Sequence, residues 1–126
     1  MPIESDRELR ILIIDDNKDF ATILCTLFEF LGHTAATADN GIEGLEKAKQ
    51  IKPDVIFCDI GLPGMNGYEV AESIRKDDAL KEVPLIALTG YAGDREKEMA
   101  KKSGFTMHIA KPVDLPELKK ILAQIS

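Results

Sequence analysis

The feature that most constrains the fold of this chain is an apolar run that leads directly into a turn-rich loop. Residues 55–58 are Val-Ile-Phe-Cys, and a continuous apolar run of this length with β-branched members favours a strand covered on both faces. The run ends on one carboxylate, Asp59, and the glycine, proline and asparagine residues between positions 61 and 67 then interrupt any regular structure. Open α/β sheets carry their chemistry at the carboxyl ends of their strands. Asp59 is therefore the first candidate for a functional residue.

The rest of the chain repeats this alternation of a strand-like run and a helix-compatible segment. Four further strand-like runs are expected, at residues 11–14, 33–38, 85–88 and 107–110. Apolar residues at helical spacing and short polar capping residues predict five helices, at residues 17–32, 41–52, 68–76, 94–103 and 115–125. Five successive βα units favour a parallel sheet with helices on both faces, so we expect one α/β domain with three α/β/α layers.

The predicted helices differ in how well they are anchored. The inward face of the first helix is expected to carry Phe20, Ile23, Leu24, Leu27 and Leu31, and that of the second Ile42, Leu45, Ala48 and Ile51. The helix at residues 94–103 has only Met99 and Ala100 as apolar anchors. Because packing supplies most of a helix's stability in a protein, we expect this helix to shift more easily than the others.

Composition and charge argue against several classes of function. The 126 residues carry a formal charge of −6, whereas nucleic acids and anionic membranes favour basic patches. The apolar runs are too short to span a bilayer, and the polar residues 1–8 resemble a loose leader rather than a signal peptide. Cys25 and Cys58 are too few for a disulfide framework, so we expect two buried thiols in a cytoplasmic protein.

Polar side chains of complementary chemistry follow the predicted strands. Asp15 and Asp16 follow the first strand, Asp59 the third, Thr89 the fourth and Lys111 the fifth. In a doubly wound sheet of order 2-1-3-4-5, strands one and three are neighbours, which would place three carboxylates in one crevice. Such carboxylates repel one another unless a cation joins them, and Mg²⁺ fits because it binds few carboxylates and keeps waters for a phosphoryl group. An aspartate can itself act as the nucleophile, a hydroxyl can donate a hydrogen bond to a phosphoryl oxygen, and a lysine can neutralise its charge.

Each of these residues has a plain structural explanation when it is considered alone. Asp16 would cap a helix, Asp15 would be a solvated strand end and Thr89 a turn residue. Lys111 would be one of many surface charges. It is the joint arrangement at the strand ends that favours a functional interpretation.

Across nearly its whole length the chain resembles the receiver domain of two-component response regulators, the CheY-like superfamily. The motifs that carry the resemblance are ILIIDD, DIGLPGMNG, LTG and IAKP, in the order and spacing of that family. The resemblance implies a flavodoxin-like, doubly wound sheet of five parallel strands in the order 2-1-3-4-5, with five helices. It also implies that residues 1–126 form a single receiver domain.

The resemblance implies a role for each matching carboxylate. Asp59 would accept a phosphoryl group from a phosphohistidine of a histidine kinase or a histidine phosphotransfer protein, with Mg²⁺ as the cofactor. Asp16, Asp59 and the backbone carbonyl of Gly61 would bind the metal, and Asp15 would support it through water. The chain would catalyse its own phosphorylation and a slow dephosphorylation, with no separate substrate.

The resemblance also implies how the signal leaves the site. Thr89 would move toward the phosphoryl group and Lys111 would pair with it, beside a cis Lys111–Pro112 peptide bond. The phosphorylated state would then change the surface formed by the fourth helix, fifth strand and fifth helix, which would contact an unknown downstream protein. No direct contact with nucleic acid and no insertion into a membrane are expected.

Two positions qualify this interpretation. The family commonly has tyrosine or phenylalanine three residues before the lysine of the fifth strand, whereas this chain has His108, which puts an aromatic rotamer switch in doubt. Gly61 and Tyr91 flank the expected phosphorylation site, and residues at similar positions in the family influence the lifetime of the phosphoryl group.

Alternatives of other classes remain open at this point. The chain could be a receiver fragment of a hybrid histidine kinase or larger regulator, or a receiver-like scaffold that is not phosphorylated. A dehalogenase-like phosphohydrolase would carry a DxD motif where this chain has Asp15-Asp16-Asn17. A flavodoxin is disfavoured because the first loop, DDNKD, is acidic where a flavin phosphate needs hydroxyls and free N–H groups.

Overall fold

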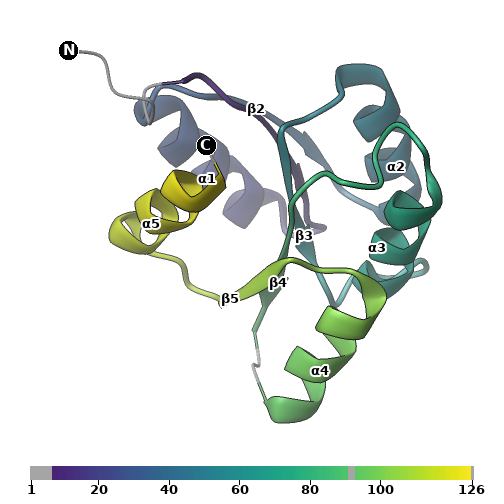
Figure 1. Ribbon diagram of the computed structural model, residues 1–126. Coiled ribbons are helices and arrows are strands. Elements are labelled where there is room, and N and C mark those ends of the chain that lie inside the picture. Colours follow the sequence, from purple (N-terminus) through teal and green to yellow (C-terminus); the bar gives the residue numbers. More distant parts are fainter. Residues whose placement is uncertain (1–6, 91–92, 126) are drawn as a thin grey trace.

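The computed structural model describes residues 7–90 and 93–125, which form one parallel sheet with helices on both faces (Figure 1). The strands are β1 (Arg10–Ile14), β2 (Thr34–Ala38), β3 (Val55–Asp59), β4 (Leu85–Thr89) and β5 (Met107–Ala110). The helices are α1 (Lys18–Phe30), α2 (Gly41–Ile51), α3 (Gly67–Lys76), α4 (Asp94–Ser103) and α5 (Leu115–Ile125). The strand order β2-β1-β3-β4-β5, with every pair parallel, confirms the predicted flavodoxin-like arrangement.

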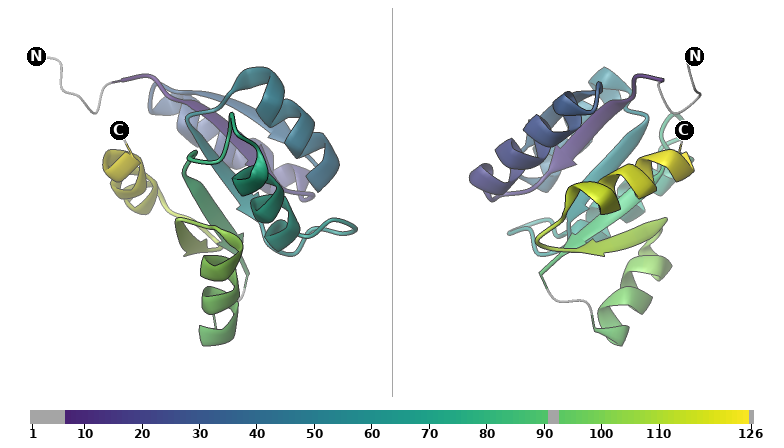
Figure 2. Two further views of the ribbon diagram at one scale, coloured as in Figure 1. Left: turned by 45° about the vertical axis from the view of Figure 1, so that its right-hand side comes forward. Right: turned by 90° about the vertical axis from the view of Figure 1, so that its left-hand side faces the viewer.

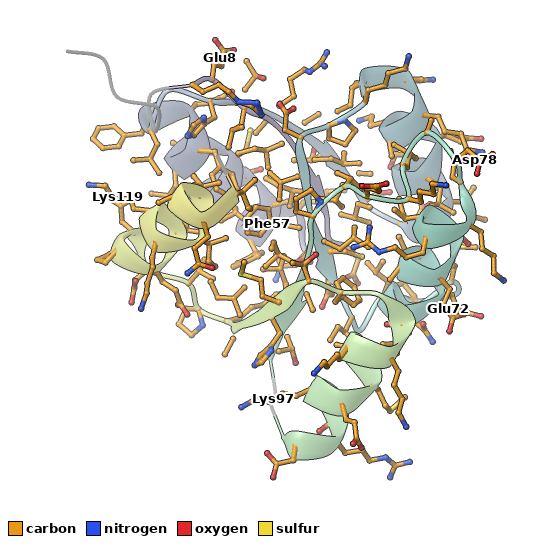
Figure 3. All side chains as sticks on the ribbon, viewed as in Figure 1. Glu8, Phe57, Glu72, Asp78, Lys97 and Lys119 are labelled. Carbon is orange, nitrogen blue, oxygen red and sulfur yellow. The ribbon has the colours of Figure 1, made fainter. Side chains whose placement is uncertain are left out.

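Two apolar cores lie on opposite faces of the sheet, because successive side chains of a strand point in opposite directions. On one face, α1 and α5 cover β-strand residues such as Ile13 and Phe57. On the other face, α2, α3 and α4 cover residues such as Leu12 and Ile56. Figure 1 shows these two groups of helices on either side of the sheet, and Figure 3 shows Phe57 in the middle of the molecule.

Short polar residues set the starts of four helices. Asn17, Asn40, Asn66 and Asp114 each accept a hydrogen bond from the backbone N–H three residues later, at 2.8–3.0 Å. At α3 the Glu69 carboxylate also accepts from the Asn66 N–H, so the two residues form a capping box. These caps satisfy backbone N–H groups that the first turn of a helix leaves unpaired. The cap of α1 is therefore Asn17 and not Asp16, for which a helix cap was the plain structural explanation.

The predicted inward faces of α1 and α2 were wrong at one residue each. Ile23 is 60% exposed and Ile42 is 62% exposed. On α2 the helix meets the sheet through small residues, because a Cβ added to Gly44 would lie only 2.5 Å from Ile14 Cδ1. Glycine contributes nothing to an apolar stripe in a sequence, so the true contact face of α2 was not visible there.

The predicted weak anchoring of α4 is confirmed, although one predicted anchor is not. Ala100 is buried, whereas Met99 is 42% exposed. The second buried residue of the helix is Ser103, whose hydroxyl donates to the Ala100 carbonyl at 2.9 Å. The helix therefore buries little apolar surface against the sheet.

The expectation of two buried thiols was met only in part. Cys58 is buried, but Cys25 is half-buried, with its thiol directed at the Ala35 carbonyl at 3.6 Å. Residues 1–6 of the predicted leader lie outside the described residues, and Arg7 contacts Asp54 through an Nη2–Oδ1 distance of 3.3 Å. Among the described residues, we find no helix with the length and apolar character needed to cross a membrane.

Candidate functional site

The carboxyl ends of the central strands bring the predicted acidic residues together. Asp15 follows β1 and Asp59 ends β3, and the two strands are neighbours with Ile14 paired to Cys58. One carboxylate oxygen each from Asp15, Asp16 and Asp59 lies within 4.8 Å of the other two. The three carboxylates that were expected to meet at this edge of the sheet therefore do so, and we call their cluster the acidic crevice.

Asp15 is the most deeply buried of the three carboxylates, at 1% exposure. Its Oδ1 accepts a hydrogen bond from the Asn17 N–H at 2.9 Å, which shapes the turn between β1 and α1. Its Oδ2 has no hydrogen-bond partner within the described parts of the chain, although the Lys111 Nζ lies 2.8 Å away as an ion pair. Asp16 is exposed, so it lies at the mouth of the crevice rather than in it.

Asp59 is the last residue of β3 and is 9% exposed. Its Oδ1 accepts a hydrogen bond from the Gly61 N–H at 3.2 Å. Burial and the nearby carboxylate of Asp15 raise the pKa of Asp59 above its ordinary value, with a smaller contribution from Asp16. Lys111 and the Gly61 N–H oppose this change by favouring the charged form. A further positive charge nearby would therefore stabilise the ionised form of Asp59.

Lys111 directly follows β5, an edge strand of the sheet, and its side chain reaches the carboxylates from there. Its Nζ lies 2.8 Å from Asp15 Oδ2, 3.8 Å from Asp59 Oδ1 and 4.5 Å from the centre of the Phe20 ring. Its backbone N–H donates to the Thr89 carbonyl at 2.8 Å, and the Lys111–Pro112 peptide bond is cis, as the resemblance implied. Phe20 was predicted only as a core residue, and nothing in the sequence marks an aromatic ring as the support of a lysine 91 positions later.

The loop after β3 approaches the Asp59 backbone closely. The Gly67 N–H, at the start of α3, donates to the Ile60 carbonyl at 3.0 Å. A Cβ added to Gly67 would lie 2.5 Å from the carbonyl oxygen of Asp59, so only glycine fits this position. Gly67 was predicted only as a loop residue, whereas it sets the distance between α3 and the end of β3.

Thr89 ends β4 and is 8% exposed. Its side chain helps to line a narrow gap between the end of β4 and α4, together with Ile60, Glu96, Lys97, Ala100 and His108. His108 is exposed on β5 and faces this gap. Tyr91, the other flanking residue predicted to matter, lies outside the described residues.

The crevice suits a small, hard divalent cation. Three carboxylates converge there, and burial together with the neighbouring carboxylates raises the pKa of Asp59. Oxygen ligands of this kind are those that Mg²⁺ prefers, and few carboxylates are enough to hold it. The residues present therefore fit the predicted metal.

Comparisons with known proteins agree with this arrangement. The model of the response regulator receiver domain matches residues 11–123. The protein PilH of Pseudomonas aeruginosa is 35% identical over 113 residues, which cover 90% of this chain and 93% of PilH.

Solved structures match over similar lengths. The chemotaxis protein CheY4 of Vibrio cholerae superposes with a TM-score of 0.90 at 28% identity, covering 95% of this chain and all of that one. The receiver domain of the sensor histidine kinase PA1611 of Pseudomonas aeruginosa superposes with a TM-score of 0.86 at 30% identity. That match covers 94% of this chain and 97% of the other, whose structure has a magnesium ion coordinated in its active site cleft.

Proposed function

The chain belongs to the response regulator receiver domain family, and on this basis we propose that it is a phosphorylatable switch with Asp59 as the acceptor. The observation that carries the proposal is the position of Asp59 at the end of β3, within 4.8 Å of two other carboxylates and 3.8 Å from Lys111. A phosphohistidine of a histidine kinase or a histidine phosphotransfer protein would be the donor. The encounter would take place in the cytoplasm.

The proposed reaction is a displacement at phosphorus. A carboxylate oxygen of Asp59 attacks the phosphoryl group, the bond from phosphorus to the donor imidazole nitrogen breaks, and its electron pair stays on the imidazole. Hydrolysis of the resulting acyl phosphate returns Asp59 and inorganic phosphate. Phosphoryl transfer depends mainly on positioning and on neutralising charge, which is what the residues around Asp59 can supply.

We propose that Asp16, Asp59 and the backbone carbonyl of Gly61 hold Mg²⁺, and that Asp15 supports the metal through water. When bound, the metal supplies positive charge that offsets the phosphoryl oxygens. Asp15 is suited to a supporting role because it is buried and its Oδ1 is already fixed by the Asn17 N–H. Asp16 is suited to direct binding because it is exposed at the mouth of the crevice.

Lys111 and Thr89 would contact the transferred phosphoryl group. Lys111 forms its shorter ion pair with Asp15 and is 3.8 Å from Asp59, so it can turn toward a new anion on Asp59 without leaving the crevice. Thr89 can donate its hydroxyl from the end of β4. Both residues connect the acceptor to β4 and β5, and so to α4.

The phosphorylated state would be read by a protein at the face formed by α4, β5 and α5. Figure 2 shows β5 at the edge of the sheet between these two helices. A groove of about 440 Å³ between α4 and β5 is lined by Lys97, Lys101, His108, Phe105 and Met107, among others. We also propose that residues 1–126 act as a single receiver domain, with residues 1–8 as a loose leader.

The proposal is tested by binding of beryllofluoride, which imitates an acyl phosphate, followed by fluorine NMR. The expected result is a protein-bound fluorine signal that requires Mg²⁺ and that is absent in Asp59→Asn. Asp78→Asn serves as the matched control, because the Asp78 side chain is fully exposed and does not belong to the cluster of three carboxylates. An equal bound signal in Asp59→Asn would remove Asp59 from its proposed role.

A further inference from the structure

The C-terminal end of α4 is held by one side chain of α3, that of Arg75. Its Nε donates to the Gly104 carbonyl at 2.9 Å, and its Nη1 donates to the carbonyls of Lys81 at 2.8 Å and Val83 at 2.7 Å. A longer contact of 3.4 Å joins Nη2 to Thr106 Oγ1. One rigid guanidinium therefore ties together α3, the connection into β4 and the turn from α4 into β5.

The turn after α4 is shaped to fit this arginine. Gly104 has a φ of +116°, and the Phe105 N–H donates back to the Ala100 carbonyl at 3.0 Å, which closes the helix in a Schellman motif. A Cβ added to Gly104 would lie 2.7 Å from Arg75 Cγ. Both the backbone angle and the packing of Arg75 therefore favour glycine here.

The other end of α4 has fewer attachments. The helix follows Gly93, and no side chain among the described residues caps its first turn. The two buried residues of the helix, Ala100 and Ser103, both lie in its second half. Figure 1 shows the first turns of α4 projecting beyond the sheet.

The gap beside Thr89, where the proposed signal would reach α4, meets the helix before its C-terminal end. The gap that Thr89 lines is bordered on α4 by Glu96, Lys97 and Ala100, which precede the Gly104 turn by four to eight residues. Two of these three residues, Glu96 and Lys97, lie in the less attached first half of the helix, so a change at the end of β4 can act there.

We infer that Arg75 is a positioning residue that makes the Gly104 turn the pivot of α4. The first turns of the helix move about this pivot, while the last turn and the start of β5 keep their places. The trigger for the movement rests on the proposed function, but the anchoring itself does not.

The anchoring is tested first on the full chain without metal, by amide hydrogen exchange resolved by residue. In the parent protein we expect slower exchange at residues 100–104 than at residues 97–99. In Arg75→Gln the exchange of residues 100–104 should become about tenfold faster, since a charge-assisted contact of this kind contributes about that factor. Lys76→Gln removes the same charge from the neighbouring, exposed position and should leave the profile unchanged.

The response is tested by repeating the exchange with Mg²⁺ and beryllofluoride. In the parent, changes should be confined to the first half of α4, whereas in Arg75→Gln they should extend through residues 100–104. The fluorine signal reports separately on Asp59, so a missing signal contradicts the proposed function while the metal-free profile still tests the anchoring. If the circular dichroism spectrum shows that Arg75→Gln is unfolded, Arg75→Lys is used instead, because lysine keeps the positive charge but lacks the several N–H donors of the guanidinium.

Two outcomes would overturn the inference. One is equal exchange in both halves of α4 in the parent protein. The other is an unchanged exchange profile in both Arg75 variants.

Discussion

The two ends of the parallel sheet differ in how their polar and charged groups are paired. At the carboxyl ends of the strands, three carboxylates crowd together and the pKa of Asp59 is raised by burial and by Asp15. At the amino ends, polar groups are paired: Arg75 donates to three backbone carbonyls, and the Arg10 N–H donates to Asp54 at 2.8 Å. The comparison indicates that polar groups at one end stabilise the fold, whereas the other end concentrates unfavourable charge.

The largest effect that would sharpen this comparison is expected at the amino end. Arg75→Met should lower the free energy of unfolding by about 3 kcal/mol, because hydrogen bonds from a charged donor to three carbonyls are lost. Urea unfolding followed by circular dichroism measures the change. The control, Lys76→Met, should stay within about 0.5 kcal/mol, as is usual for an exposed side chain. A loss as small as that of the control would show that the amino end does not carry the stability assigned to it.

At the carboxyl end, a divalent cation should stabilise the protein. Mg²⁺ at ten times its Kd should raise the free energy of unfolding by about 1.4 kcal/mol, provided that it binds the folded state alone. The same urea titration with and without Mg²⁺ measures this difference, and Asp16→Asn should reduce it. A stability that does not respond to Mg²⁺ would break the claim that the acidic crevice is a metal site.

Removal of the acceptor charge should also stabilise the metal-free protein. Because the pKa of Asp59 is raised in the folded state, its contribution to stability is fully present below its unfolded pKa, near 3.8, and is lost as the pH rises through the folded pKa. Asp59→Asn should therefore be more stable than the parent at pH 7 by about 1 kcal/mol, a typical gain when a strained functional site is relieved. Urea midpoints at pH 7 without metal measure the gain. A variant that is less stable than the parent would contradict the proposed charge repulsion.

The smallest effect concerns a histidine at the amino end. His33 Nδ1 accepts a hydrogen bond from the Leu9 N–H at 3.0 Å, and burial lowers the pKa of His33, partly opposed by Glu8. Its contribution to stability is therefore full above the unfolded pKa, near 6.5, and declines as the pH falls below that value. The contribution should be about 0.5–1 kcal/mol, the net value of one neutral hydrogen bond. Comparing urea midpoints of the parent and His33→Ala at pH 7.5 and pH 5.5 measures it, and an equal pH response in both would exclude this role.

The apolar runs and the residues that follow them were sufficient to locate the strands and the members of the acidic crevice, whereas the strand order came from the resemblance to the receiver family. Continuous apolar runs marked the strands, and the position of Asp15, Asp59 and Lys111 directly after such runs placed them at one edge of a parallel sheet. Strand ends are local features, so they can be read from neighbouring residues. The same holds for the asparagine caps, whose partners lie three residues away.

Side-chain contacts other than those among residues at the carboxyl ends of the strands could not be predicted. Arg75 meets Gly104 across 29 positions, and Phe20 supports Lys111 across 91, with no local pattern that signals either pairing. Ile23 was placed inside because it is apolar, but it is 60% exposed, and the buried residues of α1 are Ala21, Leu24 and Phe28. Hydrophobicity alone does not decide which of several apolar residues on a helix faces the core.

The central claim is that Asp59 accepts a phosphoryl group, and intact mass measurement tests it most directly. The full chain is incubated with Mg²⁺ and acetyl phosphate beside Asp59→Asn and the control Asp78→Asn. The account predicts a gain of one phosphoryl group in the parent and in Asp78→Asn, and none in Asp59→Asn. A gain of the same size in Asp59→Asn, or no gain in a parent that also fails to bind beryllofluoride, would contradict it.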